Sequence, residues 1–241
     1  MARKVCVLVP TYNRRDWLPL LIYNLKSQSY PHEDIEVIIH DDGSEPFIQD
    51  IYKVELELYP IKIHYHKQTN HISIGKKRNE LCKMAFKILG KNGIVCNMDD
   101  DDYFCPMYIE YSVNMLEDKD IQVVGSNAMF FMFPYDNWKM CAIQCGMKRQ
   151  IHESCLSMKL SHWRRMGGYA NNNRGEGSKL FDGVDHESIK VIDIRLLMCC
   201  IAHKSNTISK DQFNHEDTSL NMNFDLKEPK LIISEILKIK L

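Results

Sequence analysis

Short apolar runs and helical patterns alternate along the first hundred residues. Val5–Val9, Ile35–Ile39 and Gly93–Met98 are rich in β-branched and other apolar residues, which is typical of strands buried on both faces of a parallel sheet. Between them, residues 16–27 and 73–89 repeat apolar positions every three or four residues, as one face of a helix does. The pattern predicts an α/β fold with a doubly wound, mostly parallel sheet flanked by helices.

Capping residues agree with both helices. Asp16 is a candidate N-cap for the first helix, and its first turn tolerates Pro19. Ser73 is a candidate N-cap for the second helix, and Gly90 stands where a helix commonly ends. We therefore expect the two helices to begin and end near these residues.

The second half of the chain is less regular. Its pattern predicts a helix over Pro106–Glu117, one long strand over Ile121–Met132 and a further strand over Cys155–Lys159. Asn171–Ser178 is rich in Asn and Gly and holds little apolar surface. We expect a mobile surface loop there, of the kind that often covers a substrate.

The C-terminal segment Pro229–Leu241 has the spacing of an amphipathic helix. Its apolar positions are Leu231, Ile232, Ile236 and Ile239. We expect this face to dock on the chain's own core, in preference to a membrane or a partner surface.

Composition and charge narrow the class of protein. The 241 residues are 44% apolar and 26% charged, and the net charge of −1 gives no bulk attraction to nucleic acid or to an anionic membrane. The nine cysteines contain no CxxC pair, and several lie in apolar runs, which indicates reduced structural thiols. The apolar runs are too short for a secretion signal or a transmembrane segment. We therefore expect a cytoplasmic chain.

Polar side chains follow the ends of three predicted strands. Thr11 and Asn13 follow the first, Asp41 and Asp42 end the next, and Asp99–Asp102 end the strand after Gly93. Four consecutive carboxylates repel one another unless a cation or hydrogen-bond donors neutralise them. Oxygen ligands suit Mg²⁺ or Mn²⁺, which bind few carboxylates and take phosphate oxygens as well. The cluster favours a metal with a nucleoside diphosphate, and a solvated acidic turn with helix-capping roles is the alternative.

Several short motifs occur in an order that resembles the family 2 glycosyltransferases, inverting enzymes with the glycosyltransferase A fold. The resemblance covers roughly Val5 to Thr207. The motifs are VLVPTYNR at 7–14, QSYP at 28–31, EVIIHDDGS at 36–44, Asn70 with GKKRN at 75–79, DDDD at 99–102 with Pro106, WRRMGGY at 163–169 and HKSNT at 203–207.

The resemblance implies a single glycosyltransferase domain over residues 1–241. Residues 1–102 would form the half that binds the nucleotide sugar. Residues 103–215 would form the acceptor half with a smaller sheet, and residues 216–241 a C-terminal tail and helix.

The resemblance also implies how the donor is held. Thr11 and Asp41 would contact its base, Asp42 would lie near the base or ribose, and Asp99 would hold the ribose hydroxyls. A carboxylate at a strand end can accept the imide N–H of uracil, so the donor is expected to be a UDP-sugar. The expected donor-binding residues are Pro10, Thr11, Asn13, Asp41, Asp42, Asn70, Lys76, Arg78, Asp99 and Asp100.

Lys76 and Arg78 would supply positive charge beside the diphosphate, since a guanidinium can donate to two oxygens at once. The alternative for both is solvated charge on a helix. His64, His66 and His71 read as strand-edge or loop residues without an assigned role.

For the metal, Mn²⁺ or Mg²⁺, the resemblance implies Asp101 as a ligand. Asp99 and Asp102 are further candidates. His203 follows an apolar strand, and it either completes the metal shell or bonds the diphosphate, with His215 as the fallback.

An inverting transfer needs a general base that removes the proton of the acceptor hydroxyl. In the family this residue typically belongs to a Glu-Asp pair after the Gly-Gly element, and here the matching place holds Glu176 followed by Gly177. Glu176, Asp182 and Asp185 therefore stand as candidate catalytic residues.

The resulting hypothesis is metal-dependent, inverting transfer of a sugar from a nucleotide diphosphate sugar to a hydroxyl of a glycan or glycoconjugate. A sugar-phosphate nucleotidyltransferase is one alternative, although PTYNRR at 10–15 lacks the glycines of its usual phosphate loop. A non-catalytic sugar-nucleotide or glycan-binding module is another, motivated by Gly177. The absence of Walker A, GxGxxG and GxSxG motifs argues against P-loop kinases, dinucleotide oxidoreductases and serine hydrolases.

Overall fold

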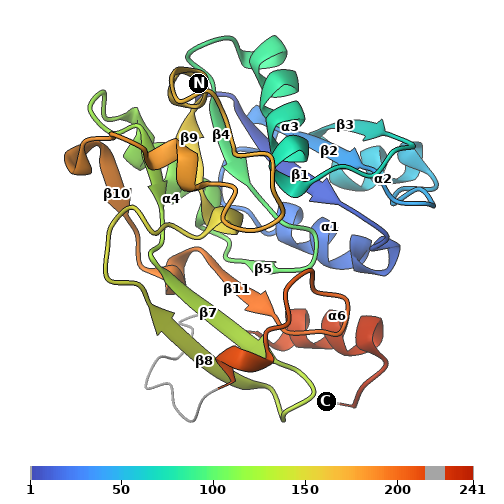
Figure 1. Ribbon diagram of the computed structural model, residues 1–241. Helices are drawn as coiled ribbons and strands as arrows, with labels where there is room; N and C mark the ends of the chain where they lie inside the picture. Colours follow the sequence, from blue (N-terminus) through green and yellow to red (C-terminus); the bar gives the residue numbers. More distant parts are fainter. Residues whose placement is uncertain (1, 215–225, 241) are drawn as a thin grey trace.

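The computed structural model describes residues 2–214 and 226–240, which form two β-sheets with helices around them (Figure 1). His215 lies outside the described residues. In strand order, the larger sheet consists of β10 (Ile189–Val191), β6 (Val123–Gly125), β9 (Ser157–Lys159), β4 (Ile94–Asn97), β1 (Val5–Thr11), β2 (Ile35–Asp41) and β3 (Lys62–Lys67).

The centre of this sheet is parallel, as predicted. β1 pairs in parallel with β2 and β4, so that Val5 lies opposite Ile35 on one side and Ile94 on the other. β9 runs antiparallel between β4 and β6, and β10 is parallel to β6. The register also places Thr11 opposite Asp41, so the polar strand ends meet at one edge of the sheet.

The helices are α1 (Leu18–Lys26), α2 (Ile51–Leu58), α3 (Ile74–Leu89), α4 (Tyr108–Glu117), α5 (Leu160–Arg165) and α6 (Lys227–Leu237). Alternate residues of β1 face opposite sides of the sheet: Val5 and Val7 join the core that contains α1 and α4, whereas Cys6 and Leu8 join the core under α3. Both faces are therefore covered, which explains the continuous apolar run of the strand.

The predicted caps hold for one helix and fail for the other. The Ser73 hydroxyl accepts a hydrogen bond from the Lys76 amide at 3.3 Å, and Gly90 ends α3 with φ of +72°. Asp16 is not an N-cap, because a 3-10 turn over Arg15–Trp17 precedes α1 and no side chain caps that helix. The pattern also missed α2 and β3, whose apolar residues are interrupted by charged ones.

The single strand predicted over residues 121–132 is wrong. The chain turns at Ser126 and leaves the larger sheet after β6, and β7 (Ala128–Phe133) begins in the smaller sheet. The Ser126 hydroxyl accepts from the Ala128 amide at 3.2 Å, which stabilises this turn. The order of the smaller sheet is β5 (Tyr103–Phe104), β11 (Met198–Ile201), β7 and β8 (Lys139–Gln144).

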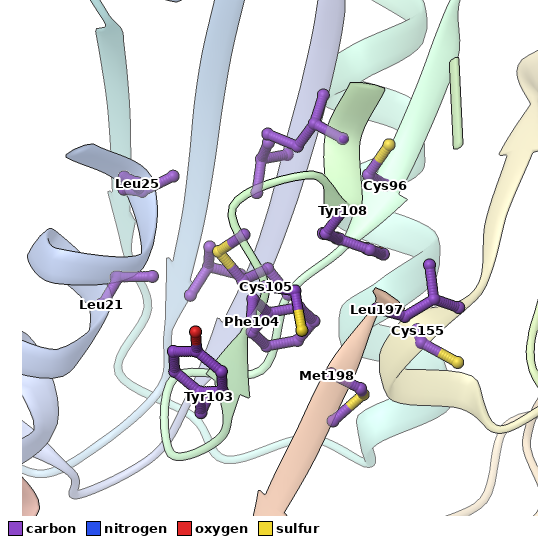
Figure 2. Packing of buried hydrophobic residues seen from close by; sticks show 14 of the residues in the cluster. Leu21, Leu25, Cys96, Tyr103, Phe104, Cys105, Tyr108, Cys155, Leu197 and Met198 are labelled. Atoms are coloured by element: carbon purple, nitrogen blue, oxygen red, sulfur yellow. The ribbon is translucent and has the colours of Figure 1, made fainter. Parts of the chain in front are cut away.

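A shared apolar core holds the smaller sheet against the larger one. Phe104 of β5 packs against Tyr108 of α4 and pairs with Met198 of β11, and Figure 2 shows these side chains at close range. Tyr108 also donates to the backbone carbonyl of Asn97, at the end of β4. The packing holds β5 and β11 beside the carboxyl end of β4, and these two strands adjoin the acidic motif and His203.

The cysteines and the C-terminal helix complete the core. Eight of the nine cysteines are buried, as expected for structural thiols. α6 packs against α1 (Figure 1), and Ile233 is its fully buried apolar residue. Leu231 was predicted on the docked face but is 42% exposed, because the buried stripe is turned toward Pro229 and Ile233.

In the described residues, no helix combines the length and the apolar character needed to cross a bilayer. The division into two halves at residue 102 stays a prediction. Asn171–Gly177 has no helix or strand and is exposed apart from Glu176 and Gly177, so the predicted loop is present.

Candidate active site

A cavity of about 490 Å³ opens at the carboxyl ends of β1 and β4, which is the size of a small-ligand site. Its walls come from segments far apart in the chain. The polar and charged side chains of the lining include Thr11, Tyr12, Asn13, Arg14, His71, Lys77, Arg78, Asp99, Asp101, Asp102, His152, Glu153, Ser154, Arg174, Glu176, Asn206 and Lys210.

Asp99 and Asp100 are held by different partners. Asp99 accepts two hydrogen bonds from Arg78 Nη2, at 2.9 and 3.1 Å, and one from the Ser154 hydroxyl at 2.6 Å. Asp100 is fully buried and accepts from the Thr11 hydroxyl at 2.5 Å and from Arg14 Nη1 at 3.1 Å. Asp99 lines the cavity, whereas Asp100 stands behind it.

Asp101 is the carboxylate with the most polar neighbours in the cavity wall. Its Oδ2 atom lies 2.9 Å from Nε2 of His203, 3.1 Å from Nη2 of Arg14 and 3.3 Å from Nδ2 of Asn206. Burial by itself raises the pKa of Asp101, but Arg14 and His203 outweigh it and hold the pKa below the usual range. Asp101 is therefore charged in this arrangement.

At Asp102, the influences that raise the pKa outweigh those that lower it. Asp102 accepts a hydrogen bond from the Ile201 amide at 3.0 Å, which joins the acidic motif to β11. Burial, together with repulsion from Asp101 and Asp99, raises its pKa well above the usual value. The motif thus combines a charged carboxylate with one that favours its neutral form.

Arg14 connects the acidic motif to the segment after β11. Besides Asp100 and Asp101, its guanidinium donates to the Ser205 carbonyl at 3.3 Å. The side chain is a local source of positive charge for buried carboxylates. Sequence reasoning noted Arg14 only as part of a motif and gave it no role.

Asp41 and Asp42 are buried at the strand end and lie behind the cavity wall. Asp41 accepts from the amides of Gly43 and Phe47, each at 2.8 Å, and from the Tyr65 hydroxyl at 2.6 Å. Their position behind Tyr12 and Asn13 means that these carboxylates shape the loops around the cavity.

Asp42 forms a buried ion pair with Lys77, which also donates to the Thr11 carbonyl at 2.7 Å. The Ile72 amide donates to Asp42 at 2.8 Å. Burial raises the pKa of Asp42, yet Lys77 and Ile72 together bring it below the usual value. His71 lies 3.1 Å from the same carboxylate.

The GKKRN and WRRMGGY motifs meet in space. The Asn79 side chain accepts from the amide of Tyr169 and from the Trp163 indole, both at 2.9 Å, and donates to the Tyr169 carbonyl at 2.9 Å. Gly168 has φ of +82°, and a Cβ there would lie 2.4 Å from Oδ1 of Asn79, so the close approach requires glycine. This contact fixes the start of the loop that carries Glu176.

Besides Asp41, Asp42 and Asp100, three further carboxylates or amides of the predicted set lie outside the cavity lining. Asn70, Asp182 and Asp185 are exposed, and Asp185 accepts from the Glu187 amide at 3.1 Å as the cap of a 3-10 turn. His203 is buried beside Asp101, and its ring packs at a tilt against Trp17, with ring centroids 4.3 Å apart. Glu176 lies in the wall and accepts from Nε of Arg78 at 3.1 Å.

Lys76 was predicted to lie beside the diphosphate, but its neighbour on α3, Lys77, is the lysine that reaches the cavity. Lys76 is exposed and outside the cavity lining, whereas Lys77 is buried in it. The helical spacing contained this signal, because Lys77 stands four residues before the buried Leu81 and Lys76 four before the half-exposed Glu80. Glu153 and His71 also line the cavity and were not predicted.

The donor set suits a divalent cation that arrives with phosphate ligands. Among the described residues, no group of three or more His, Cys, Asp or Glu side chains is arranged to hold a metal by itself. Asp99, Asp101 and Asp102 nevertheless line the cavity together. Mg²⁺ typically binds through one or two carboxylates, with water and phosphate oxygens as its other ligands.

Sequence comparison identifies relatives of the chain. The model of Glycosyl transferase family 2 matches residues 6–189, more than half of the chain. A poly(ribitol-phosphate) beta-glucosyltransferase of Bacillus spizizenii is 29% identical over 100 residues, and the poly(ribitol-phosphate) beta-N-acetylglucosaminyltransferase TarS of Staphylococcus aureus is 32% identical over 103. Each match covers 42% of this chain and only 15% or 16% of the relative, so it spans less than a fifth of those proteins.

Solved structures share the fold. S. aureus TarS 1–349 in complex with UDP-GlcNAc has a TM-score of 0.65, with 17% identity, and the match covers 97% of this chain and 71% of that one. The mannosyltransferase PcManGT from Pyrobaculum calidifontis, in complex with GDP-Man and Mn²⁺, has a TM-score of 0.63, with 18% identity, and coverages of 85% and 59%. The fold is thus the expected glycosyltransferase A fold. With the family match over its larger part, the chain belongs to glycosyl transferase family 2.

Proposed function

We propose that the protein transfers a sugar from a UDP-sugar to a hydroxyl of a glycan or glycoconjugate, with inversion at the anomeric carbon and with Mn²⁺ or Mg²⁺. The observation that carries the proposal is the cavity itself, where Asp99, Asp101 and Asp102 face basic side chains across one space. A nucleoside diphosphate with a divalent cation matches that mixture of charges.

The residues divide into a base end and a phosphate end. Tyr12 is 42% exposed at the cavity, and its ring is tilted by 37° against that of His71, with ring centroids 4.0 Å apart. The exposed part of the Tyr12 ring can pack against a nucleobase. Thr11 and Asn13 adjoin it in the wall. We place the donor's base beside these residues.

At the phosphate end, Asp101 and Asp99 would hold the metal, with Asp102 behind them. A bound divalent ion supplies Lewis-acid stabilisation of a diphosphate leaving group. Arg78, Arg174 and Lys210 contribute positive charge to the same cavity. Such pre-arranged charge favours departure of the diphosphate because it need not reorganise during the reaction.

Known structural relatives support a nucleotide-sugar donor but differ in its base. TarS was solved with UDP-GlcNAc and PcManGT with GDP-Man and Mn²⁺. We favour uridine because TarS, whose match covers 97% of this chain, was solved with UDP-GlcNAc. The acceptor is proposed as a hydroxyl-bearing glycan by analogy with the poly(ribitol-phosphate) transferases.

The first test is thermal stabilisation by UDP, GDP, CMP and dTDP, each with and without Mn²⁺. A ligand that binds only the folded state raises the melting temperature by mass action. We expect the largest shift with UDP and Mn²⁺ together. Equal shifts with all four nucleotides would contradict the uridine assignment, and no shift with any would contradict the donor site.

Product analysis separates the alternatives. Incubation with UDP-sugars and glycan acceptors is expected to release UDP. Release of pyrophosphate from a nucleoside triphosphate and a sugar phosphate would instead identify a nucleotidyltransferase. Tight donor binding without turnover, over a wide range of acceptors, would identify a binding module.

A further inference from the structure

We propose that Glu153 is the general base of the transfer reaction. This inference rests on the proposed function and assigns a role within the same cavity. Glu153 belongs to none of the sequence motifs, and it reaches the site from a 3-10 turn, Glu153–Cys155, that precedes β9. It lines the cavity together with Ser154 and Glu176.

The turn places Glu153 beside the acidic motif. The hydroxyl of the next residue, Ser154, donates to Asp99 at 2.6 Å, and the carbonyl of Glu153 accepts from Nδ2 of Asn97 at 2.7 Å. Asn97 is the last residue of β4. These two hydrogen bonds therefore anchor the Glu153–Ser154 backbone to the end of β4 and to the acidic motif.

Gly177 explains how Glu153 reaches this position. A Cβ atom at residue 177 would lie 2.9 Å from Cγ and 3.3 Å from Oε1 of Glu153. The Gly177 amide donates to Oε1 of Glu153 at 3.3 Å. The carboxylate of Glu153 thus occupies the space into which a side chain at residue 177 would project, and glycine is the residue that leaves this space open.

The other carboxylates at this side of the cavity are engaged or remote. Glu176 pairs with Arg78, which also holds Asp99. Asp182 and Asp185 are exposed and outside the cavity lining. In residues 2–214 and 226–240, the structure gives Glu153 no ion pair, so its carboxylate is free to accept a proton from a substrate.

The surroundings of Glu153 also suit proton transfer. Burial first, and then the charge of Glu176, raise its pKa above the ordinary glutamate value, while Arg78 and the Gly177 amide oppose this shift. The neighbouring His152 is neutral near pH 7, because burial and the positive charges of Lys210 and Arg78 lower its pKa to about 4. A base whose pKa lies closer to neutral accepts a proton more effectively in the transition state.

In the proposed step, the acceptor hydroxyl gives its proton to the carboxylate of Glu153. The acceptor oxygen forms a bond to the anomeric carbon, and the bond from that carbon to the diphosphate oxygen breaks. Its electron pair leaves with the nucleoside diphosphate. The products are the glycosylated acceptor, the nucleoside diphosphate and protonated Glu153, which returns the proton to water.

The test compares Glu153→Gln with wild-type protein, using UDP-sugars and glycan acceptors that the wild-type protein turns over. Glutamine keeps the shape but cannot take the proton, so we expect kcat to fall about 100-fold or more. The donor KM and the melting temperature should stay near their wild-type values. Glu187→Gln, at an exposed carboxylate, is the matched control and should keep wild-type turnover.

The pH profile separates a base from a structural residue. In wild-type protein kcat should fall as the pH drops through the pKa of Glu153, and the remaining activity of Glu153→Gln should lack that limb. A Glu153→Gln protein with kcat within threefold of wild type would overturn the proposal. So would a lowered kcat that keeps the acid limb unchanged.

A relocated carboxylate gives a second test that does not depend on the single variant. Glu153→Ala removes the atoms that a side chain at residue 177 would meet, and Gly177 has φ of −75°, which any residue adopts. We expect Glu153→Ala with Gly177→Asp to exceed Glu153→Ala alone in kcat by about tenfold or more. A double variant that binds UDP but is no faster would count against the shared position.

Different results would contradict the proposed function and the role of Glu153. If the proposed function is wrong, wild-type protein releases no nucleoside diphosphate from any nucleotide sugar, and both inferences fall. If only the role of Glu153 is wrong, wild-type protein is active and Glu153→Gln is equally active.

Discussion

The two acidic pairs at the edge of the larger sheet have similar sequences and different surroundings. Asp41 and Asp42 lie behind the cavity wall, and their oxygens accept hydrogen bonds from backbone amides, Tyr65 and Lys77. Asp99 and Asp101 are held by Arg78, Arg14 and His203, whose side chains border the cavity or lie directly behind it.

A carboxylate at a strand end can therefore stabilise the loop that follows it, or it can remain available to a bound ligand. Asp41 and Asp42 order the loops over Gly43–Phe47 and at Ile72, which carry no charge into the cavity. Asp99 and Asp101 keep side-chain partners, which can rearrange when a ligand brings its own charge. The four predictions below test this division, from the largest expected effect to the smallest.

Lys77→Met should destabilise the fold by about 3–5 kcal/mol, because it leaves the buried Asp42 carboxylate without its cation. Lys76→Met, one residue earlier on the exposed face of α3, should change stability by less than about 0.5 kcal/mol. Urea unfolding of both variants measures the difference. Adding Asp42→Asn to Lys77→Met should recover part of the loss; equal stability of the two single variants would contradict the role given to the buried pair.

Asp101→Asn should lower transferase activity by about 100- to 1,000-fold, the usual loss when a group that stabilises transition-state charge is removed. The melting temperature should not fall by a comparable amount, because Arg14 keeps Asp100 as a partner. The measurement is UDP release in the presence of Mn²⁺, followed by melting curves without nucleotide. Full activity of this variant would contradict the proposed metal site.

Acid should weaken the buried Asp42–Lys77 ion pair and so lower the stability of the fold. The pKa of Asp42 is lowered in the folded protein, so the unfolded chain binds more protons below about pH 5, and stability falls as the pH drops further. Urea unfolding at pH 5, 4 and 3 should show a steeper loss in wild type than in Asp42→Asn, which lacks the titrating group. Parallel losses in the two proteins would mean that other carboxylates dominate.

Tyr12→Ala should weaken UDP binding by about tenfold, since stacking of a base on an aromatic ring contributes about 1–3 kcal/mol. Isothermal titration with UDP and Mn²⁺ measures the effect. Tyr52→Ala removes a tyrosine that is 80% exposed on α2 and should bind UDP as wild type does. A similar loss in both variants would remove Tyr12 from the donor site.

Much of the fold follows from local patterns. The continuous apolar runs at 5–9 and 35–39 predict buried parallel strands, and Ser73 and Gly90 delimit α3, because these signals act within a few residues. The turn at Ser126 was missed because apolar residues continue on both sides, although Gly125, Ser126 and Asn127 form a cluster typical of turns.

The candidate site, like the fold, could be predicted only in part from local sequence patterns. The acidic motif and its position at a sheet edge could be predicted, because parallel strands end at a common edge. Which carboxylate faces the cavity depends on partners from distant segments, such as Arg14 for Asp101 and Gly177 for Glu153, and local propensity carries no information about them.

The sequence by itself determined the family, the alternation of strands and helices and the cluster of carboxylates at the strand ends. Only the tertiary structure decided that Asp41 and Asp42 lie behind the cavity wall and that Glu153 enters the site. The physical reason is that burial and charge pairing are set by packing between distant segments, which bring together side chains that have no relation along the chain.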